Sequence, residues 1–324
     1  MTYFACARTA LRMALQTTQV PRGEKILLPD FVCDVLLHPL RQLGLVPIYY
    51  PVTQALSPDW RALEAVATEV HACALVMPHY FGQPQDIERF RSLCSAHRLL
   101  LIEDNAHGYG GTFKGRPLGS FGDIGISSPR KILGTPSGGI LHNVDTLSAE
   151  CTKSLKPYPV YRPRSLIKMT FRNHSPVWRF AKGMATRNCD WNDPHLFRES
   201  VQPDYRIDGF SRRRIMSADW NGIASRRRKA WFAWDRFARS KKLSPIFSDA
   251  YSESCPWAMP VYAKDTVERN RWLTWGAKNG IPLFPWPTLP EEIITEEGEA
   301  LARWRRLICF PLDSTPEELG IRWQ

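Results

Sequence analysis

Short apolar runs alternate with segments of helical periodicity over about the first 145 residues of this 324-residue chain. Apolar runs bounded by turn residues predict strands over 25–29, 46–52, 72–78, 99–104, 123–128 and 138–143. Apolar residues at helical spacing predict helices over 7–18, 32–44 and 84–97. Pro39 should kink or break the second of these helices. Because strands that alternate with helices usually pair in parallel, we expect an α/β domain with a mostly parallel sheet covered on both faces.

The alternation stops near residue 150, where Pro, Arg and aromatic residues become frequent. Periodicity returns near residue 215, where the pattern predicts helices over 220–242 and 267–280 and a strand over 257–263. A further helix is expected within 296–312, running toward an apolar stretch. We therefore divide the chain into an α/β domain (1–150), a basic, aromatic-rich connecting segment (151–214) and a smaller C-terminal α+β domain (215–324).

Positive charge is concentrated in one part of the chain. The net charge is +11, and residues 152–242 contain 22 Lys or Arg against 7 Asp or Glu. Such a segment suits an anionic partner, which would be a nucleotide diphosphate, a membrane surface or nucleic acid, and an ordinary solvated face is the alternative. No DNA- or RNA-binding motif is present, so we expect no nucleic acid. Weak peripheral contact of residues 162–184 with a membrane is a secondary expectation.

Several classes of protein do not fit this sequence. No uninterrupted apolar run approaches the roughly 20 residues of a membrane span, and the N-terminus lacks the order of a signal peptide, so we expect a cytoplasmic protein. The eight cysteines form no C-x-x-C pair, and the histidines show no metal-ligand spacing. We therefore expect no metal site and no disulfide framework.

Three separated features are together typical of pyridoxal phosphate (PLP) chemistry. Asp104 ends a predicted strand, and carboxyl ends of strands are where α/β folds place their ligands. Lys131 lies in a turn rich in Ser, Pro and Gly, and a predicted helix begins at Ala7 and Arg8. A lysine can form a Schiff base, a carboxylate can pair with the pyridine nitrogen, and a helix N-terminus can bind a phosphate. Each feature alone is weak evidence, whereas their order and spacing together favour this chemistry.

The residues from Pro78 to Leu141 resemble the DegT/DnrJ/EryC1/StrS sugar aminotransferases. The similarity is carried by the pattern EDxAH…KGxxxGSFGD…K, and weaker similarity extends back to the N-terminal ARTALRMAL. The resemblance implies a fold-type I PLP-transferase large domain and a homodimer whose sites are completed by both subunits. It also implies PLP as the cofactor.

The resemblance also implies roles for individual residues. Lys131 would be the Schiff-base lysine, and Asp104 would pair with the pyridinium nitrogen. Ala106 would pack under the cofactor ring, and His107 would lie near its hydroxyl group. The phosphate would be bound by the backbone amides of Ala7 and Arg8 and by Ser127 or Ser128.

The chain departs from the family pattern at several positions. Cys6-Ala7-Arg8 stands where relatives usually carry Ser-Gly-Thr, so Arg8 is expected either to contact phosphate or to face solvent. Cys33 occupies the usual place of a stacked aromatic ring, with Phe31 two residues earlier, which leaves the stacking partner open. In relatives, a loop reaches across the dimer to the cofactor phosphate in the neighbouring subunit. The candidate for this neighbour-subunit loop is residues 209–217, which would bring the guanidinium groups of Arg212, Arg213 and Arg214 to the substrate. His79, at a predicted strand end, is a further candidate substrate residue.

The function implied by the resemblance is transfer of an amino group, with glutamate as the expected donor, to the keto group of a nucleotide-linked sugar for polysaccharide, lipopolysaccharide or secondary-metabolite biosynthesis. Lys131 would act as nucleophile, general base and general acid. One branch of the family dehydrates its sugar and has histidine at the lysine position, so Lys131 argues against that branch. The alternatives are an aminotransferase acting on a non-nucleotide ketone such as a cyclitol, and a degenerate member that binds PLP without turnover.

Overall fold

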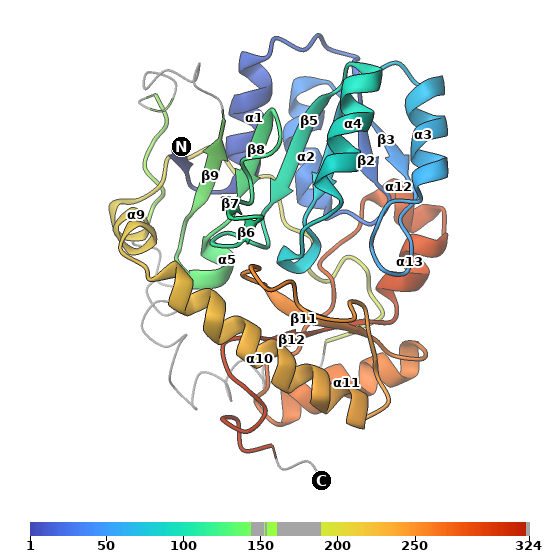
Figure 1. Ribbon diagram of the computed structural model, residues 1–324, viewed down its shortest axis with the longest axis vertical. Coiled ribbons are helices and arrows are strands. Elements are labelled where there is room, and N and C mark those ends of the chain that lie inside the picture. The colour runs from blue at the N-terminus through green and yellow to red at the C-terminus, as the bar shows by residue number, and fades with distance from the viewer. Residues whose placement is uncertain (144–151, 153, 161–188, 322–324) are drawn as a thin grey trace.

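The main sheet of the computed structural model, which describes residues 1–143, 152, 154–160 and 189–321, has the strand order β1-β9-β8-β5-β4-β2-β3. The strands are β1 (Thr2–Phe4), β2 (Lys25–Pro29), β3 (Val46–Tyr50), β4 (Ala72–Pro78), β5 (Leu100–Asn105), β8 (Ile124–Ser127) and β9 (Gly139–His142). Strands β3, β2, β4, β5 and β8 run parallel, whereas β9 and β1 join the edge in antiparallel pairing. The predicted α/β fold with a mostly parallel sheet is confirmed (Figure 1).

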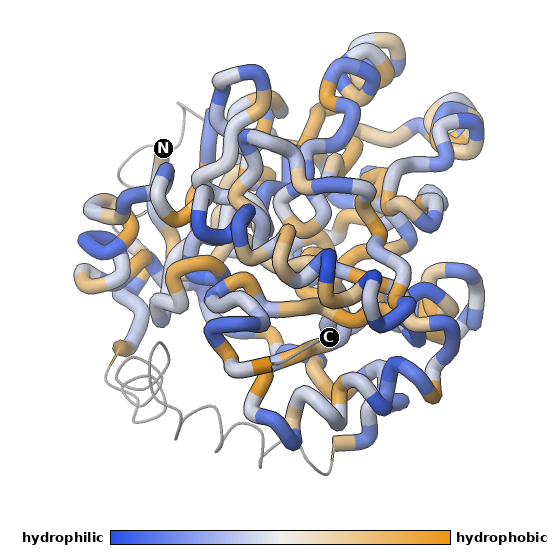
Figure 2. Tube along the Cα trace, turned by 60° about the horizontal axis from the view of Figure 1, so that its bottom comes forward, coloured by the Kyte–Doolittle hydropathy of each residue, from blue (hydrophilic) through white to orange (hydrophobic). Residues whose placement is uncertain are grey.

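Helices cover both faces of this sheet, and alternate strand residues point to each layer. Leu27, Leu75 and Leu101 belong to an apolar cluster with α3 (Trp60–Glu69) and α4 (Ile87–His97). Their neighbours Ile26, Ala74 and Ile102 belong to a cluster with α1 (Ala7–Thr17) and α2 (Leu37–Leu43). Hydrophobic and hydrophilic residues alternate along these helices, as expected for elements that bury one face (Figure 2).

Several elements differ from the sequence-based expectation. The helix predicted over 32–44 is divided into a 3-10 turn, η1 (Asp34–Leu36), and α2. Pro39 is tolerated in the first turn of α2, where a backbone N–H would have no intrahelical acceptor. Three features were not predicted from the sequence: β1, helix α3 and the short hairpin of β6 (Thr112–Phe113) and β7 (Arg116–Pro117). Asp59, which accepts a hydrogen bond from the Ala62 amide, was an available start signal for α3.

A second, antiparallel sheet lies beside the first and contains β10 (Ser244–Pro245), β11 (Ala258–Tyr262) and β12 (Leu307–Pro311) (Figure 1). The helices of this half are α9 (Gly209–Met216), α10 (Trp220–Ser240), α11 (Thr266–Lys278), α12 (Glu291–Thr295) and α13 (Glu299–Trp304). Within 296–312 only α13 is helical, and the apolar stretch forms β12, because it pairs with β11. The domain boundaries at residues 150 and 214 stay a prediction.

Much of the basic segment lies outside the described residues. This includes the whole of 162–184, the stretch expected to contact a membrane. None of the helices in the described ranges has the length and apolar character needed to cross a bilayer.

Candidate functional site

A cavity lies where β4, β5 and β8 end, next to the N-terminus of α1. This is the edge at which parallel sheets place ligands. Among the residues predicted for the site, the cavity is lined by Ala7, Arg8, His79, Asp104, Ala106, His107, Ser128 and Lys131. The fold therefore brings together side chains that lie up to 124 positions apart in the sequence, from Ala7 to Lys131.

Lys131 reaches the cavity from α5 (Arg130–Leu133), a single turn that follows β8. Its Nζ lies 4.8 Å from the centre of the Trp257 ring, which covers it. Burial lowers the pKa of Lys131, while the nearby Cys33 and Asp104 partly oppose this shift. A lowered pKa increases the fraction of neutral amine, which is the nucleophilic and basic form.

Asp104 is a partly buried carboxylate near the end of β5. Its Oδ1 accepts a hydrogen bond from the Ala106 amide at 2.9 Å. Burial raises the pKa of Asp104, and the Ala106 amide and the charge of Lys131 only partly compensate. A cationic N–H entering the cavity would stabilise the ionised carboxylate, so Asp104 suits a protonated ring nitrogen.

His107 is held as a neutral ring. It stacks on Trp257 with a centroid distance of 4.4 Å, and its Nδ1 accepts a hydrogen bond from the Phe81 amide at 3.3 Å. Burial, together with the charge of Lys131, lowers the pKa of His107 well below its ordinary value. The proton of this neutral imidazole is therefore on Nε2, which can donate to a ligand oxygen.

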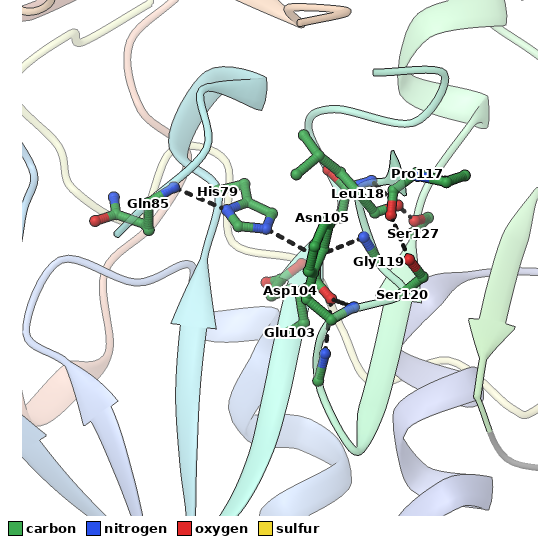
Figure 3. A network of polar contacts seen from close by, with 12 residues as sticks. His79, Gln85, Glu103, Asp104, Asn105, Pro117, Leu118, Gly119, Ser120 and Ser127 are labelled. Atoms are coloured by element: carbon green, nitrogen blue, oxygen red, sulfur yellow. Dashed lines mark hydrogen bonds and ion pairs between the residues drawn. The ribbon is translucent and has the colours of Figure 1, made fainter. Parts of the chain in front are cut away.

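Glu103, beside Asp104 on β5, organises the other side of the site (Figure 3). Its Oε1 accepts hydrogen bonds from His79 Nε2 at 2.9 Å and from the Gly119 amide at 2.5 Å. Its Oε2 accepts from the amides of Phe121 (2.6 Å) and Gly122 (2.9 Å). Burial raises the pKa of Glu103, but His79 and these amides outweigh burial, so the pKa lies below its usual value. One carboxylate thus joins β4, β5 and the loop before β8.

His79 lines the cavity in a defined tautomer. Its Nδ1 accepts a hydrogen bond from the Gln85 amide at 3.1 Å, so its Nε2 carries the proton that is donated to Glu103 (Figure 3). Both ring nitrogens are therefore engaged by the protein. His79 can shape the cavity, but it has no free nitrogen for substrate.

The N-terminus of α1 presents its first amides to the cavity through Ala7 and Arg8. Cys6 precedes the helix, and its side chain makes no capping hydrogen bond to these amides. Arg8 lines the cavity, and its Nη1 pairs with Glu199 Oε2 at 2.8 Å. The helix end and Arg8 together favour an anion, which is the property expected of a phosphate site.

The two candidate serines have different environments. Ser128 lines the cavity, whereas Ser127 is fully buried away from it. The Ser127 hydroxyl is 2.9 Å from His142 Nε2 and accepts a hydrogen bond from Asn105 Nδ2 at 3.2 Å. The expectation that either serine could touch the phosphate is therefore reduced to Ser128, because successive strand residues point to opposite sides.

His142 makes the stability of the protein sensitive to acid. It is 2% exposed, and burial lowers its pKa to about 4. The pKa of His142 is thus lower in the folded protein than in the unfolded chain. As the pH falls from about 6.5 toward 4, protonation of His142 therefore favours the unfolded chain, and stability that is present above pH 6.5 is lost. We expect the free energy of unfolding, measured with urea, to fall by about 2 kcal/mol more between pH 7 and pH 5 in the wild type than in H142Q. The exposed control H71Q should keep the wild-type slope, and an equal slope in H142Q would contradict the assignment.

The segment predicted as a neighbour-subunit loop is helical. Residues 209–216 form α9 because Asp208 caps it, accepting hydrogen bonds from the amide and hydroxyl of Ser211. Arg213 and Arg214 are exposed, and Arg212 lies over the Tyr3 ring at 5.6 Å. None of the three arginines lines the cavity in the part of the chain that the structure describes.

Sequence reasoning missed cavity residues supplied by the C-terminal half. Trp286 lines the cavity, is 2% exposed, and its Nε1 hydrogen-bonds to no described residue. Trp257 covers Lys131 and His107. Cys33 does line the cavity, but Phe31 packs behind it against Trp286, with ring centroids 4.9 Å apart. No local sequence signal marks these tryptophans, because only the packing of the two halves brings them here.

Comparison with known proteins identifies relatives of the first half. The sequence model of the DegT/DnrJ/EryC1/StrS aminotransferase family matches residues 3–171. The GDP-perosamine synthase of Vibrio cholerae is 27% identical over 150 residues, which are 44% of this chain and 40% of that protein. The L-glutamine:2-deoxy-scyllo-inosose aminotransferase of Streptomyces kanamyceticus is 29% identical over 152 residues, 45% of this chain and 35% of that protein. The chain thus spans about two fifths of the length of the curated relatives it matches.

Solved structures resemble the whole fold. A Streptococcus pneumoniae protein, described as a sugar aminotransferase and solved in its PLP form, has a TM-score of 0.70 at 15% identity. The match covers 98% of this chain and 84% of that chain. At this identity the likeness concerns the fold.

Proposed function

Since this chain belongs to the DegT/DnrJ/EryC1/StrS aminotransferase family, we propose that it transfers an amino group from glutamate to the keto group of a nucleotide-linked sugar, with PLP as cofactor. The observation that carries this proposal is the convergence of Lys131, Asp104 and the N-terminus of α1 on one cavity. A nucleophilic amine, a strand-end carboxylate and an anion site are the three groups that a phosphorylated pyridine aldehyde requires.

The residues present fit the cofactor. Lys131 would hold its aldehyde carbon, and Asp104, whose pKa is raised by burial, would hold its protonated ring nitrogen. Ser128 and the first amides of α1 would bind its phosphate. When bound, PLP supplies an electron sink for the carbon that exchanges the amino group.

The protein's own groups would then perform the proton transfers. Lys131 Nζ would take the proton from the α-carbon of the amino donor and return it later, which requires a neutral amine and is favoured by its lowered pKa. The neutral His107 would donate from Nε2 without adding a positive charge next to Lys131. Trp257 and Trp286 would exclude water from these groups.

A non-nucleotide ketone such as a cyclitol is the second candidate acceptor. The S. kanamyceticus relative is named for such a cyclitol ketone. Amino transfer to a keto-sugar nucleotide and to a cyclitol ketone, measured side by side, would separate the two candidates.

Further parts of the proposal concern assembly and context. We infer a homodimer, a cytoplasmic location and a product used in polysaccharide, lipopolysaccharide or secondary-metabolite biosynthesis. The support for these is family membership and, for the location, the lack of a bilayer-crossing helix among the described residues. Sedimentation of the purified chain would test the dimer.

The direct test is the visible absorption spectrum of the protein with PLP, recorded before and after excess glutamate. We expect a visible band on cofactor addition and its loss when glutamate converts the cofactor to the amine form. Failure of the protein to form the band would refute the cofactor assignment. A band that no amino donor alters would favour the degenerate member over the aminotransferase.

Replacing Asp104 tests the ring-nitrogen contact. D104N keeps the oxygen that accepts from the Ala106 amide but removes the charge. We expect the visible band to form, while the rate of its loss with glutamate falls by about 10²-fold, because the variant lacks the negative charge that would stabilise a protonated ring nitrogen. A rate equal to that of the wild type in stopped-flow measurements would place the ring nitrogen elsewhere.

A further inference from the structure

An ion pair between Arg8 and Glu199 lies beside the proposed phosphate site. Arg8 is at the second position of α1 and lines the cavity, and its Nη1 is 2.8 Å from Glu199 Oε2. The Arg8 side chain is 14% exposed, whereas the Glu199 side chain is 50% exposed. The cation is therefore held within the protein, while the carboxylate can turn into solvent with little loss of packing.

Glu199 belongs to a strap, residues 198–205, that is attached at both of its ends. Before Glu199, Arg198 pairs with Glu291 of α12 at 2.7 Å. After it, Asp204 pairs with Arg12, one turn along α1 from Arg8, also at 2.7 Å. Between these attachments residues 199–203 are exposed and belong to no helix or strand. Glu199 can consequently leave Arg8 without breaking either attachment.

The Glu199 carboxylate lies in a positive electrostatic potential that nearby cations create. Burial raises the pKa of Glu199, but Arg8 and Arg130 outweigh burial, so the pKa lies below its usual value. Lys131 adds to the same field. Arg130 also lines the cavity, and its buried Nε hydrogen-bonds to no described residue. The carboxylate thus neutralises a cluster of cations that faces the cavity.

We propose that Glu199 is an internal anion that pairs with Arg8 in the cofactor-free protein and is displaced when the cofactor's phosphate binds at the start of α1. The inference rests on the proposed function, since it takes that phosphate as the competing anion. A carboxylate and a phosphate beside one guanidinium repel each other, so keeping Glu199 in place opposes phosphate binding. Glu199 therefore lowers the affinity of the site for a phosphorylated ligand relative to the same ligand without phosphate.

The test compares pyridoxal phosphate with pyridoxal, which lacks the phosphate. Each is titrated into the cofactor-free wild type, E199Q and D204N, and binding is followed by the visible band. We expect the Kd for pyridoxal phosphate to fall about fivefold in E199Q, while the Kd for pyridoxal stays unchanged. D204N removes the neighbouring ion pair of the same strap without touching the cavity, so it should bind both ligands as the wild type does.

An unchanged or weaker affinity of E199Q for pyridoxal phosphate would overturn the proposal, and so would an equal gain for pyridoxal.

A second measurement does not depend on the aldehyde: inorganic phosphate should raise the thermal midpoint of cofactor-free E199Q more than that of the wild type. If the wild type forms no visible band with either aldehyde, the proposed function fails, and the phosphate measurement alone decides about Glu199. Equal thermal shifts in the two proteins would then refute its role.

Discussion

The K131A protein is expected to form no visible band with PLP and to transfer amino groups at least about 10³-fold more slowly than the wild type. The reason is that Lys131 lines the cavity with a lowered pKa, and in the proposed function this amine both holds the cofactor aldehyde and moves the proton. Loss of the amine removes both steps at once, so the defect should appear in kcat and should not be rescued by more substrate.

The matched control is K114A. Lys114 is an exposed lysine that pairs with Glu88 on the surface, outside the cavity. It should keep the spectrum and the rate of the wild type. If K131A kept the visible band, PLP would be bound without Lys131. That result would refute the assignment of Lys131 as the lysine that holds the cofactor.

The E103A protein is expected to lose about 4 kcal/mol of stability in urea unfolding. Glu103 is fully buried and accepts hydrogen bonds from His79 and from the amides of Gly119, Phe121 and Gly122. Alanine leaves these four donors without their acceptor, and an unsatisfied buried donor costs about 1–3 kcal/mol. Because the loop from Gly119 to Gly122 leads into β8 and Lys131, cofactor binding should weaken as well.

Two further variants separate this effect from general damage. E103Q keeps the shape but places an amide against N–H donors, so we expect a loss of about 2 kcal/mol and a protein that still folds. E88Q removes an exposed carboxylate and should leave the urea midpoint unchanged. Since the pKa of Glu103 is lowered, its contribution is present above about pH 4 and is lost on further acidification, and this loss should be missing in E103Q. Wild-type stability in E103A would contradict the network.

Local sequence was sufficient to predict the parallel strands of the sheet and to point to the residues at their ends. Strand β4 is a continuous apolar run that ends at Pro78, and β5 begins as an apolar run and then reaches Asp104, and both Pro78 and Asp104 line the cavity. Lys131 follows β8 by only four residues, so its place at the same edge follows from the parallel order of β5 and β8. The motif around these residues also carried the family resemblance.

Other features needed information that no short stretch contains. Ser127 and Ser128 could be told apart only once β8 was placed, since His142 from β9 takes the Ser127 hydroxyl. Residues 209–216 carry a loop motif in the resemblance, yet Asp208 caps them into α9. The helix α3 was missed although its cap, Asp59, and its apolar face with Leu63 and Ala67 were both readable.

The sequence by itself predicted the α/β class, because apolar periodicity is a local property. Its motifs also singled out Lys131, Asp104 and His107, which the structure brings to one cavity. Only the tertiary structure decided that Trp286 lines the cavity, that Trp257 covers Lys131 and that Glu199 pairs with Arg8. These contacts join residues more than 100 positions apart, and they depend on how the second sheet and the strap pack on the first, which no periodicity encodes.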